Sequence, residues 1–258
     1  MFLRSNVRAA GLAYAGQPLQ ADYVAAFEDD RIVAVVAHCW NGMLLVQAPV
    51  QVAAVARAVV QHSGRPVTGL SGPGAQVAAA RRALGFEHRP APKLGQEELF
   101  ALDLTDLVVP SPLAQGRWAC RHPRDDEMDL LTRWRVAFCR EALHRADSPG
   151  LRDECREDIG LMHVQRRDWL LTDGDRPVAF SAFNATLPDT VQVGGVWTPP
   201  EHRGNGYGRA VVAGSLLDAR QAGVTRAVLF AEREDAKRAY TGIGFRAVGE
   251  FGLVLFEV

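Results

Sequence analysis

The sequence has little of what marks several specialised classes of protein. Its 29 lysine and arginine residues are balanced by 30 aspartate and glutamate residues, for a net charge of -1. No excess of one sign therefore favours binding to nucleic acid or to an anionic membrane surface. The longest apolar run, from Ile32 to Ala37, is far too short to cross a bilayer. These absences favour a globular protein that acts on neither nucleic acid nor membranes.

Cysteine is also scarce, with four residues at Cys39, Cys120, Cys139 and Cys155. None belongs to a Cys-x-x-Cys pair, and no histidine lies at the spacing of a zinc site. We expect reduced, buried or half-buried thiols and no metal. The first 15 residues hold no uninterrupted apolar stretch like the core of a signal peptide. The sequence therefore predicts a cytoplasmic location.

What the sequence does have is enough apolar material for two cores. Hydrophobic residues make up 48% of 258 positions, a length that suits one large domain or two small ones. The prolines at Pro110 and Pro112 indicate a linker. Each half shows a strand-turn-strand unit, a further strand, a helix, and a second helix that ends in Gly-Phe, at Gly85-Phe86 and Gly244-Phe245. The pattern predicts two related α/β (α+β) domains at 1–110 and 113–258.

The second half alternates between strand and helix patterns. Asp125 or Asp126 is expected to cap a helix whose apolar residues recur at three and four, from Leu130 to Leu143. The remaining elements expected are helices at 151–163, 207–222 and 235–243 and strands at 191–198, 225–231 and 247–258. Each domain is thus expected to be a mixed central sheet flanked by helices.

A glycine-rich loop follows the strand at 191–198. Pro199-Pro200 ends the strand, because proline cannot donate a hydrogen bond to a neighbouring strand. The loop Arg203-Gly204-Asn205-Gly206-Tyr207-Gly208 then leads into an apolar helix. Glycines let backbone amides close on an anion, and the start of a helix adds N–H groups and a partial positive charge. Together with the charge of Arg203, this order predicts a phosphate site.

The spacing of the loop separates several kinds of phosphate site. A dinucleotide loop has Gly-x-Gly-x-x-Gly, but here the third glycine, Gly208, comes one residue early and Arg209 stands in its place. The Gly-Lys-Ser/Thr of a nucleotide triphosphate loop is absent. The remaining alternatives are a different phosphate-bearing cofactor or a glycine-rich surface turn without a ligand.

The loop resembles the Arg/Gln-x-x-Gly-x-Gly/Ala loop of the GCN5-related N-acetyltransferases, the GNAT superfamily. Two further segments resemble that family: Val196 to Arg203, like its fourth strand and the exit from it, and Ala236 to Phe245, like its Ala-x-x-x-Tyr-x-x-x-Gly-Phe helix. The helix pattern from Trp134 to Ala142 is similar to a bacterial subgroup with a degenerate N-terminal GNAT-like domain before an active one. The resemblance implies tandem GNAT-like domains and acetyl-CoA as cofactor. The residues that it assigns to the cofactor are Val196, Trp197, Thr198, Arg203, Gly204, Asn205, Gly206, Tyr207, Gly208 and Arg209.

The resemblance also implies a mechanism, in which a neutral amine attacks the thioester and a base takes its proton. Tyr240, five residues before Phe245, matches the tyrosine that protonates the leaving thiolate; otherwise it is a core tyrosine. No motif fixes the base, and the candidates are Glu141 and Glu232, which could equally be surface carboxylates. Many relatives have asparagine where this sequence has Arg233, so one polar contact with the cofactor is in doubt.

The first half lacks this chemistry. Its matching segment, Pro49 to Val55, holds neither glycine nor arginine, and Arg81 occupies the tyrosine position. We expect Gly69 to Gly74 to form a tight turn. No motif names the acceptor. The function expected is N-acetyl transfer to an amine of a small molecule or peptide; the alternatives are a CoA-binding sensor or scaffold protein without transfer, and an O-acyl or aminoacyl transferase. The protein is expected to be a monomer or a homodimer.

Overall fold

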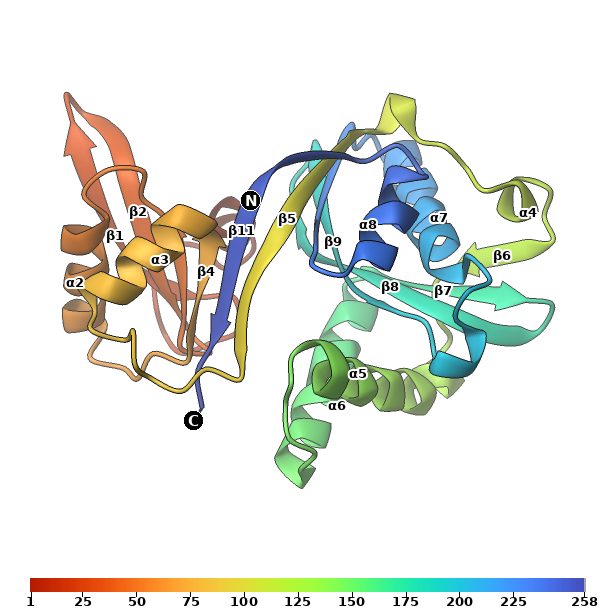
Figure 1. The fold of residues 1–258 in the computed structure, drawn as a ribbon, viewed down its shortest axis with the longest axis horizontal. Coiled ribbons are helices and arrows are strands. Elements are labelled where there is room, and N and C mark those ends of the chain that lie inside the picture. Colours follow the sequence, from red (N-terminus) through yellow and green to blue (C-terminus); the bar gives the residue numbers. More distant parts are fainter. Residues whose placement is uncertain (258) are drawn as a thin grey trace. The chain divides into compact units, whose positions relative to one another are not determined.

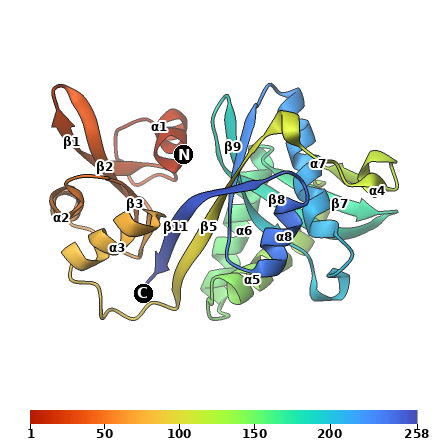
Figure 2. The ribbon, with the colours of Figure 1, turned by 45° about the horizontal axis from the view of Figure 1, so that its top comes forward.

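The computed structural model describes residues 1–257, and these form two compact units. One unit holds Met1–Glu98 together with the residues from Gly249 onward, and the other holds Leu99–Val248. This division differs from the expected one at 1–110 and 113–258. Two strands, β5 (Lys93–Asp103) and β11 (Arg246–Leu255), each begin in one unit and end in the other (Figures 1 and 2). The chain therefore returns to its first unit at its C-terminal end.

The first unit has the strand order β1-β2-β3-β4-β11. Its elements are α1 (Phe2–Ala10), β1 (Ala21–Glu28), β2 (Arg31–Cys39), β3 (Met43–Gln47), α2 (Val52–Ser63), β4 (Gly69–Pro73) and α3 (Gly74–Ala83). Strand β11 pairs with β4 in antiparallel fashion, with Phe251 opposite Pro73 and Leu255 opposite Gly69. Helices α2 and α3 pack against each other, and their buried valines and alanines share a core with Val36, Leu44 and Leu70 of the sheet.

The prediction of a tight turn at Gly69 to Gly74 is wrong, because this segment forms strand β4 and the start of α3. Its glycines serve close approach between strands. A Cβ on Gly69 would collide with the carbonyl oxygen of Val254, and a Cβ on Gly72 would collide with the carbonyl oxygen of Val46. Glycine is therefore required here by neighbouring backbone that only the folded sheet brings near.

The second unit has the strand order β5-β10-β9-β8-β7-β6. Its other elements are α4 (Ser111–Ala114), β6 (Trp118–Arg121), α5 (Met128–Ala142), α6 (Pro149–Val164), β7 (Asp168–Asp173), β8 (Arg176–Thr186), β9 (Thr190–Trp197), α7 (Tyr207–Gln221), β10 (Arg226–Ala231) and α8 (Glu234–Thr241), with 3-10 turns at Leu104–Asp106, Asp125–Glu127 and Pro200–His202. Strands β6 to β9 pair antiparallel in sequence, whereas β9 and β10 pair parallel. The sheet is mixed, which confirms the expected α/β fold class.

Helices cover both faces of this sheet (Figure 1). Helices α5 and α6 lie on one face, and α7 and α8 lie on the other. Helix α7 is the most deeply buried, with Val211, Val212 and Leu216 fully enclosed against β6, β7 and β8. Its Gly214 lies so close to Cys120 of β6 that a Cβ there would collide with that side chain. Within residues 1–257, no helix combines the length and apolarity that a membrane crossing requires.

The start of α5 differs from the expectation. Neither Asp125 nor Asp126 caps the helix; both lie in the 3-10 turn before it, and α5 begins at Met128. The carboxylate of Glu127 instead accepts a hydrogen bond from the backbone N–H of Arg124 and a bidentate pair of hydrogen bonds from Arg121. Glu127 is 6% exposed, whereas the side chain of Arg121 is 32% exposed, so the carboxylate is the buried partner of this ion pair.

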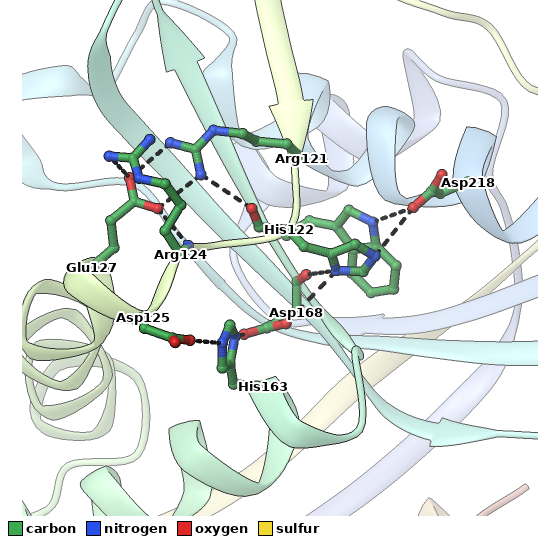
Figure 3. A network of polar contacts seen from close by, with 9 residues as sticks. Arg121, His122, Arg124, Asp125, Glu127, His163, Asp168 and Asp218 are labelled. Carbon is green, nitrogen blue, oxygen red and sulfur yellow. Dashed lines mark hydrogen bonds and ion pairs between the residues drawn. The ribbon is translucent and has the colours of Figure 1, made fainter.

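A network of polar side chains joins the end of α6 to β7 (Figure 3). His163 lies between two carboxylates, with Nε2 3.0 Å from Asp125 and Nδ1 3.2 Å from Asp168. Asp168 is fully buried, and His122 Nδ1 lies 2.8 Å from its backbone oxygen. Burial alone would lower the pKa of His163, but the hydrogen bonds and charges of Asp125 and Asp168 hold it above its usual value. Protonated His163 therefore ties α6 to the sheet.

This network predicts a stability that falls as the pH rises. A histidine whose pKa is raised on folding stabilises the fold fully below its unfolded pKa of about 6.5, and that contribution is lost as the pH passes through the higher folded value. Urea unfolding of the native protein at about pH 6 and about pH 8.5 should show this loss, and His163→Gln should remove most of it. The exposed His88, changed to glutamine, is the matched control. An unchanged pH slope in His163→Gln would contradict the assignment.

Candidate functional site

Strands β9 and β10 separate part of the way along their length. Their parallel pairing covers Thr190–Gln192 on β9 and Arg226–Val228 on β10. Strand β9 then continues to Trp197 and β10 to Ala231. The edge of β9 that faces β10 beyond Gln192 therefore presents backbone N–H and C=O groups that this pairing does not use. Such an edge can bind an extended ligand as an added strand would.

A β-bulge lies in the separated part of β9. Trp197 pairs with Phe180 and Gly194 with Ala182, so Gly195 and Val196 together lie opposite one residue of β8. Gly195 has φ of +62°, a conformation that favours glycine. A Cβ at Gly195 would also lie 3.3 Å from Nη1 of Arg135 on α5. The bulge thus turns part of the β9 backbone toward the opening and brings it close to a guanidinium.

The glycine-rich loop lies directly after β9 and forms the start of α7. Gly204 and Gly206 both have φ of +82°, and Gly206 is the N-cap of the helix. The amide of Asn205 donates hydrogen bonds to the backbone oxygens of His202 and Arg203, which holds the loop in its curve. The first hydrogen bond of α7 runs from the N–H of Ala210 to the oxygen of Gly206. The N–H groups before Ala210 therefore remain for an anion at the helix start.

Three side chains predicted for this loop point in different directions. Arg203 donates to the carbonyl oxygen of Thr198 at 3.1 Å and lies over the ring of Trp197, 5.0 Å from its centre. Arg209 is exposed, and its guanidinium lies beside Gly206. Tyr207 instead donates its hydroxyl to Asp173 at 2.6 Å. The loop can therefore offer an anion the side chains of Arg203 and Arg209, but only the backbone of Tyr207.

Tyr240 lies near the end of α8, with its ring packed edge-on against Phe245. It is 9% exposed, and burial, with a smaller effect from Asp235, raises the pKa of its hydroxyl well above the usual value. The group therefore stays protonated at neutral pH and can act as a proton donor rather than as a base. Its surroundings include core residues of the second unit, so it also has a packing role.

The candidate base Glu141 is engaged by two arginines. One oxygen accepts a hydrogen bond from Arg203 at 2.8 Å, and the other lies 3.6 Å from Nη1 of Arg233. Arg233 also makes a bidentate pair with Asp235. Arg233 is thus part of a surface network of charges, in which Glu141 links α5 to the glycine-rich loop. Glu232 follows β10 and is exposed.

Glu141 borders a cavity of about 670 Å³ in the second unit. Trp197 and Pro200, at the end of β9 and just beyond it, form one side, and the end of α5 with the segment that leads to α6 forms the rest. The other lining residues are Ala137, Arg140, His144, Arg145, Ala146 and Asp147. The cavity therefore brings a carboxylate, an aromatic ring and several cationic groups to the end of the separated strand.

Sequence reasoning missed two parts of this site. Arg135 lies on α5 beside the bulge, and nothing in its local sequence sets it apart from the other arginines of that helix. The segment of 143–148 lines the cavity but carries no recognisable motif. A signal for the bulge was present, since Gly194-Gly195 interrupts a strand pattern and glycine pairs in strands often mark bulges. His202, which a loop position would leave exposed, is buried against the ring of Tyr207.

Comparison with known proteins finds similarity to the GNAT family, which the sequence motifs also resemble. Residues 129–245 match the model of the acetyltransferase (GNAT) family. No curated protein matches the chain. Among solved structures, a GCN5-related N-acetyltransferase from Kribbella flavida has a TM-score of 0.65 at 17% identity, covering 99% of this chain and 93% of that one. An acetyltransferase from the GNAT family of Colwellia psychrerythraea has a TM-score of 0.54 at 12% identity, over 92% and 86% of the two chains.

A third solved structure is similar along both units. It is a tandem GNAT protein from the clavulanic acid biosynthesis pathway, with a TM-score of 0.54 at 13% identity, over 98% of this chain and 92% of that one. At such low identities these likenesses establish the fold, while the family model covers most of the second unit. Residues 129–245, within the second unit, are therefore similar to the acetyltransferase (GNAT) family, and the chain has the fold of solved GNAT structures.

Proposed function

We propose that the protein transfers the acetyl group of acetyl-CoA to an amine of a small molecule or peptide. The observation that carries the proposal is the separation of β9 from β10, with the bulge at Gly195 inside it and the glycine-rich loop at its end. An edge of free backbone groups suits the amide-bearing pantetheine arm. A helix start with glycines at positive φ suits the pyrophosphate. CoA carries both features, an amide-bearing arm and a pyrophosphate, in one molecule.

The residues present fit this cofactor. A Cβ on Gly204 would meet nothing within 4 Å, so the backbone of the loop is uncovered there, whereas a Cβ on Gly208 would stand 3.3 Å from the hydroxyl oxygen of Thr198. The N–H groups of Tyr207, Gly208 and Arg209 would hold phosphate oxygens, with the charges of Arg203 and Arg209 beside them. The backbone of Val196, Trp197 and Thr198 would hold the arm. When bound, acetyl-CoA supplies a reactive acyl thioester.

The chain's own residues would then orient the reactants and move protons. The backbone N–H groups turned by the bulge at Gly195 can donate to the acyl oxygen and stabilise the charge that develops there. Glu141 and Glu232 are the candidates that would take the proton of the attacking amine. The buried hydroxyl of Tyr240 would give a proton to the departing sulfur, because its raised pKa keeps it protonated. Glu141 must first release Arg203, with which it forms a hydrogen bond.

We also propose that the first unit is a degenerate GNAT-like domain that does not bind CoA. Strands β3 and β4 pair in parallel from Met43 to Leu45, as β9 and β10 do at their start. Beyond this point Gly72 lies against the carbonyl oxygen of Val46, and the N–H of Ala48 donates a hydrogen bond of 2.7 Å to the side-chain oxygen of Gln76. The N–H of Ala48 and the space beside the carbonyl of Val46 are thus taken up by the protein itself.

The test of the proposed function is a pair of measurements on the full chain. Acetyl-CoA at about 100 times its Kd should raise the stability by about 2.7 kcal/mol, seen as a higher melting temperature. Release of free thiol from acetyl-CoA should then depend on an added amine from a panel of amines, amino acids and peptides. No thermal shift would overturn the cofactor assignment. A shift without thiol release for any amine would instead support a binding protein without transfer.

A further inference from the structure

Two cysteines of the second unit form a pair between α5 and α6. The Sγ atoms of Cys139 and Cys155 lie 3.8 Å apart, and Cys155 donates its S–H toward Cys139. Cys139 is 4% exposed and Cys155 is 1% exposed, in a small apolar cluster with Leu151 and Leu143. A disulfide needs about 2.05 Å between the sulfur atoms, so the two sulfurs must approach by roughly 1.8 Å. Rotation of the side chains and a small shift of one helix can provide this.

The surroundings favour the thiolate form of one partner. The S–H of Cys155 and, to a lesser extent, the guanidinium of Arg135 lower the pKa of Cys139, although burial opposes them. The same contact raises the pKa of Cys155, which therefore stays a thiol. Arg135, one turn earlier on α5, is held in place by Asp158 at 3.0 Å. A thiolate beside a neutral thiol is the arrangement from which a disulfide forms.

The other two cysteines differ from this pair. Burial raises the pKa of Cys39 and of Cys120 to about 12. The Sγ of Cys120 lies 3.7 Å from the carbonyl oxygen of Val211 on α7. Cys39 belongs to the first unit and Cys120 to the second. Reactivity toward oxidants follows thiolate character and exposure, so the buried Cys39 and the half-buried Cys120 serve as internal references within the same protein.

The position of the pair connects it to the cavity. A bond between Cys139 and Cys155 would close a loop over residues 140–154. Six of the nine residues that line the cavity lie in that loop: Arg140, Glu141, His144, Arg145, Ala146 and Asp147. Arg135, whose charge helps to lower the pKa of Cys139, also lies beside the bulge at Gly195. Drawing α5 toward α6 would therefore move the cavity wall and Glu141 relative to β9.

We propose that Cys139 and Cys155 are a redox modification site, at which a reversible disulfide reshapes the cavity that Glu141 borders and lowers transfer. The oxidant is a peroxide. The Cys139 thiolate attacks one oxygen of hydrogen peroxide and becomes a sulfenic acid with release of hydroxide, which takes up the proton that Cys139 had lost and becomes water. The Cys155 sulfur then attacks that sulfur, and its proton leaves with the hydroxyl as a second water. Two thiols and one peroxide thus give one disulfide and two waters. A thiol reductant reverses the bond by exchange. The effect on transfer rests on the proposed function, whereas the disulfide itself does not.

The first arm of the test needs no activity. The full chain is treated with hydrogen peroxide, alkylated and digested without reductant. We expect a mass loss of about 2 Da, two hydrogens, in a peptide pair that joins Cys139 to Cys155, and its recovery after treatment with a reductant. Cys139→Ala and Cys155→Ala should each abolish it, and Cys39→Ala/Cys120→Ala should retain it. Oxygen adducts without a crosslink, or a crosslink that involves Cys39 or Cys120, would overturn the proposal even if every variant is unstable.

The second arm measures transfer with an amine found active in the panel. We expect the oxidised protein to lose at least about tenfold in kcat/KM for the amine, because displacements near 1 Å at reacting groups can cost about 100-fold. Reductant should restore the rate, and Cys39→Ala/Cys120→Ala should behave in the same way. A crosslinked protein with unchanged amine kinetics would overturn the regulatory role. Absence of transfer in the reduced protein would overturn the proposed function and leave the first arm to judge the disulfide.

Discussion

Tyr240→Phe should lower kcat about 100- to 10,000-fold, the usual range for the loss of a positioned proton donor. The affinity for acetyl-CoA should stay within about twofold. The hydroxyl of Tyr240 would act only when the sulfur departs, so its loss does not weaken the binding of the intact cofactor. Tyr240 is 9% exposed, and phenylalanine fills the same space beside Phe245. Burial raises the pKa of the hydroxyl, so the native group carries its proton throughout the neutral range.

Tyr23→Phe is the matched control. This tyrosine belongs to the first unit, and burial, with a smaller effect of Cys39, raises the pKa of its hydroxyl to about 12. The variant therefore loses the same atom from a partly buried ring whose hydroxyl oxygen is itself buried, with no expected change in kcat. The readouts are thiol release at saturating substrates for kcat and calorimetric titration for affinity. If Tyr240→Phe kept kcat within twofold of the native protein, Tyr240 would have only its packing role.

The helices of the second unit could be predicted closely because the signals that start and end them lie in neighbouring residues of the sequence. Helix α7 begins at Tyr207 as expected, since the glycine-rich loop cannot continue a strand and the apolar run that follows it suits a buried helix. Helix α6 lies within two residues of its expected start because Ser148 and Pro149 provide a cap and a first turn, and the Ser148 hydroxyl accepts from the N–H of Leu151. Such signals are carried by neighbouring residues and need no knowledge of the rest of the fold.

Strand partners could not be predicted in the same way. The apolar pattern at the C-terminus predicts a strand, and β11 is there, but nothing in its residues says that Phe251 to Leu255 pair with β4 of the first unit. Close approach has the same limit. Gly69 to Gly74 reads as a turn by composition, and only the carbonyl groups of Val46 and Val254, distant in sequence, explain those glycines. Arg135 is a third case, because its place beside Gly195 follows from how α5 packs on β9.

Gly206→Glu should weaken acetyl-CoA binding by roughly 1,000-fold. The residue is the N-cap of α7, where the pyrophosphate is proposed to lie, and a carboxylate about 4 Å from a phosphate charge costs about 4 kcal/mol at an effective dielectric constant of about 20. It would also attract the guanidinium of Arg209, which lies beside Gly206. The penalty should shrink as salt is added, since the site is exposed to solvent. Calorimetric titration at low and high salt measures both effects.

The substitution also strains the backbone, and this second effect needs its own control. Gly206 has φ of +82°. Placing a residue with a Cβ in that conformation lowers the stability of the protein by about 1–2 kcal/mol. Gly223, at the other end of the same helix, has φ of +91° and open space around it. Gly223→Glu therefore introduces the same charge and similar strain far from the glycine-rich loop. Both variants should melt earlier, and Gly223→Glu by more, because a carboxylate is favoured at the start of a helix and disfavoured at its end. Only Gly206→Glu should lose acetyl-CoA, and equal affinities in the two variants would place the phosphate elsewhere.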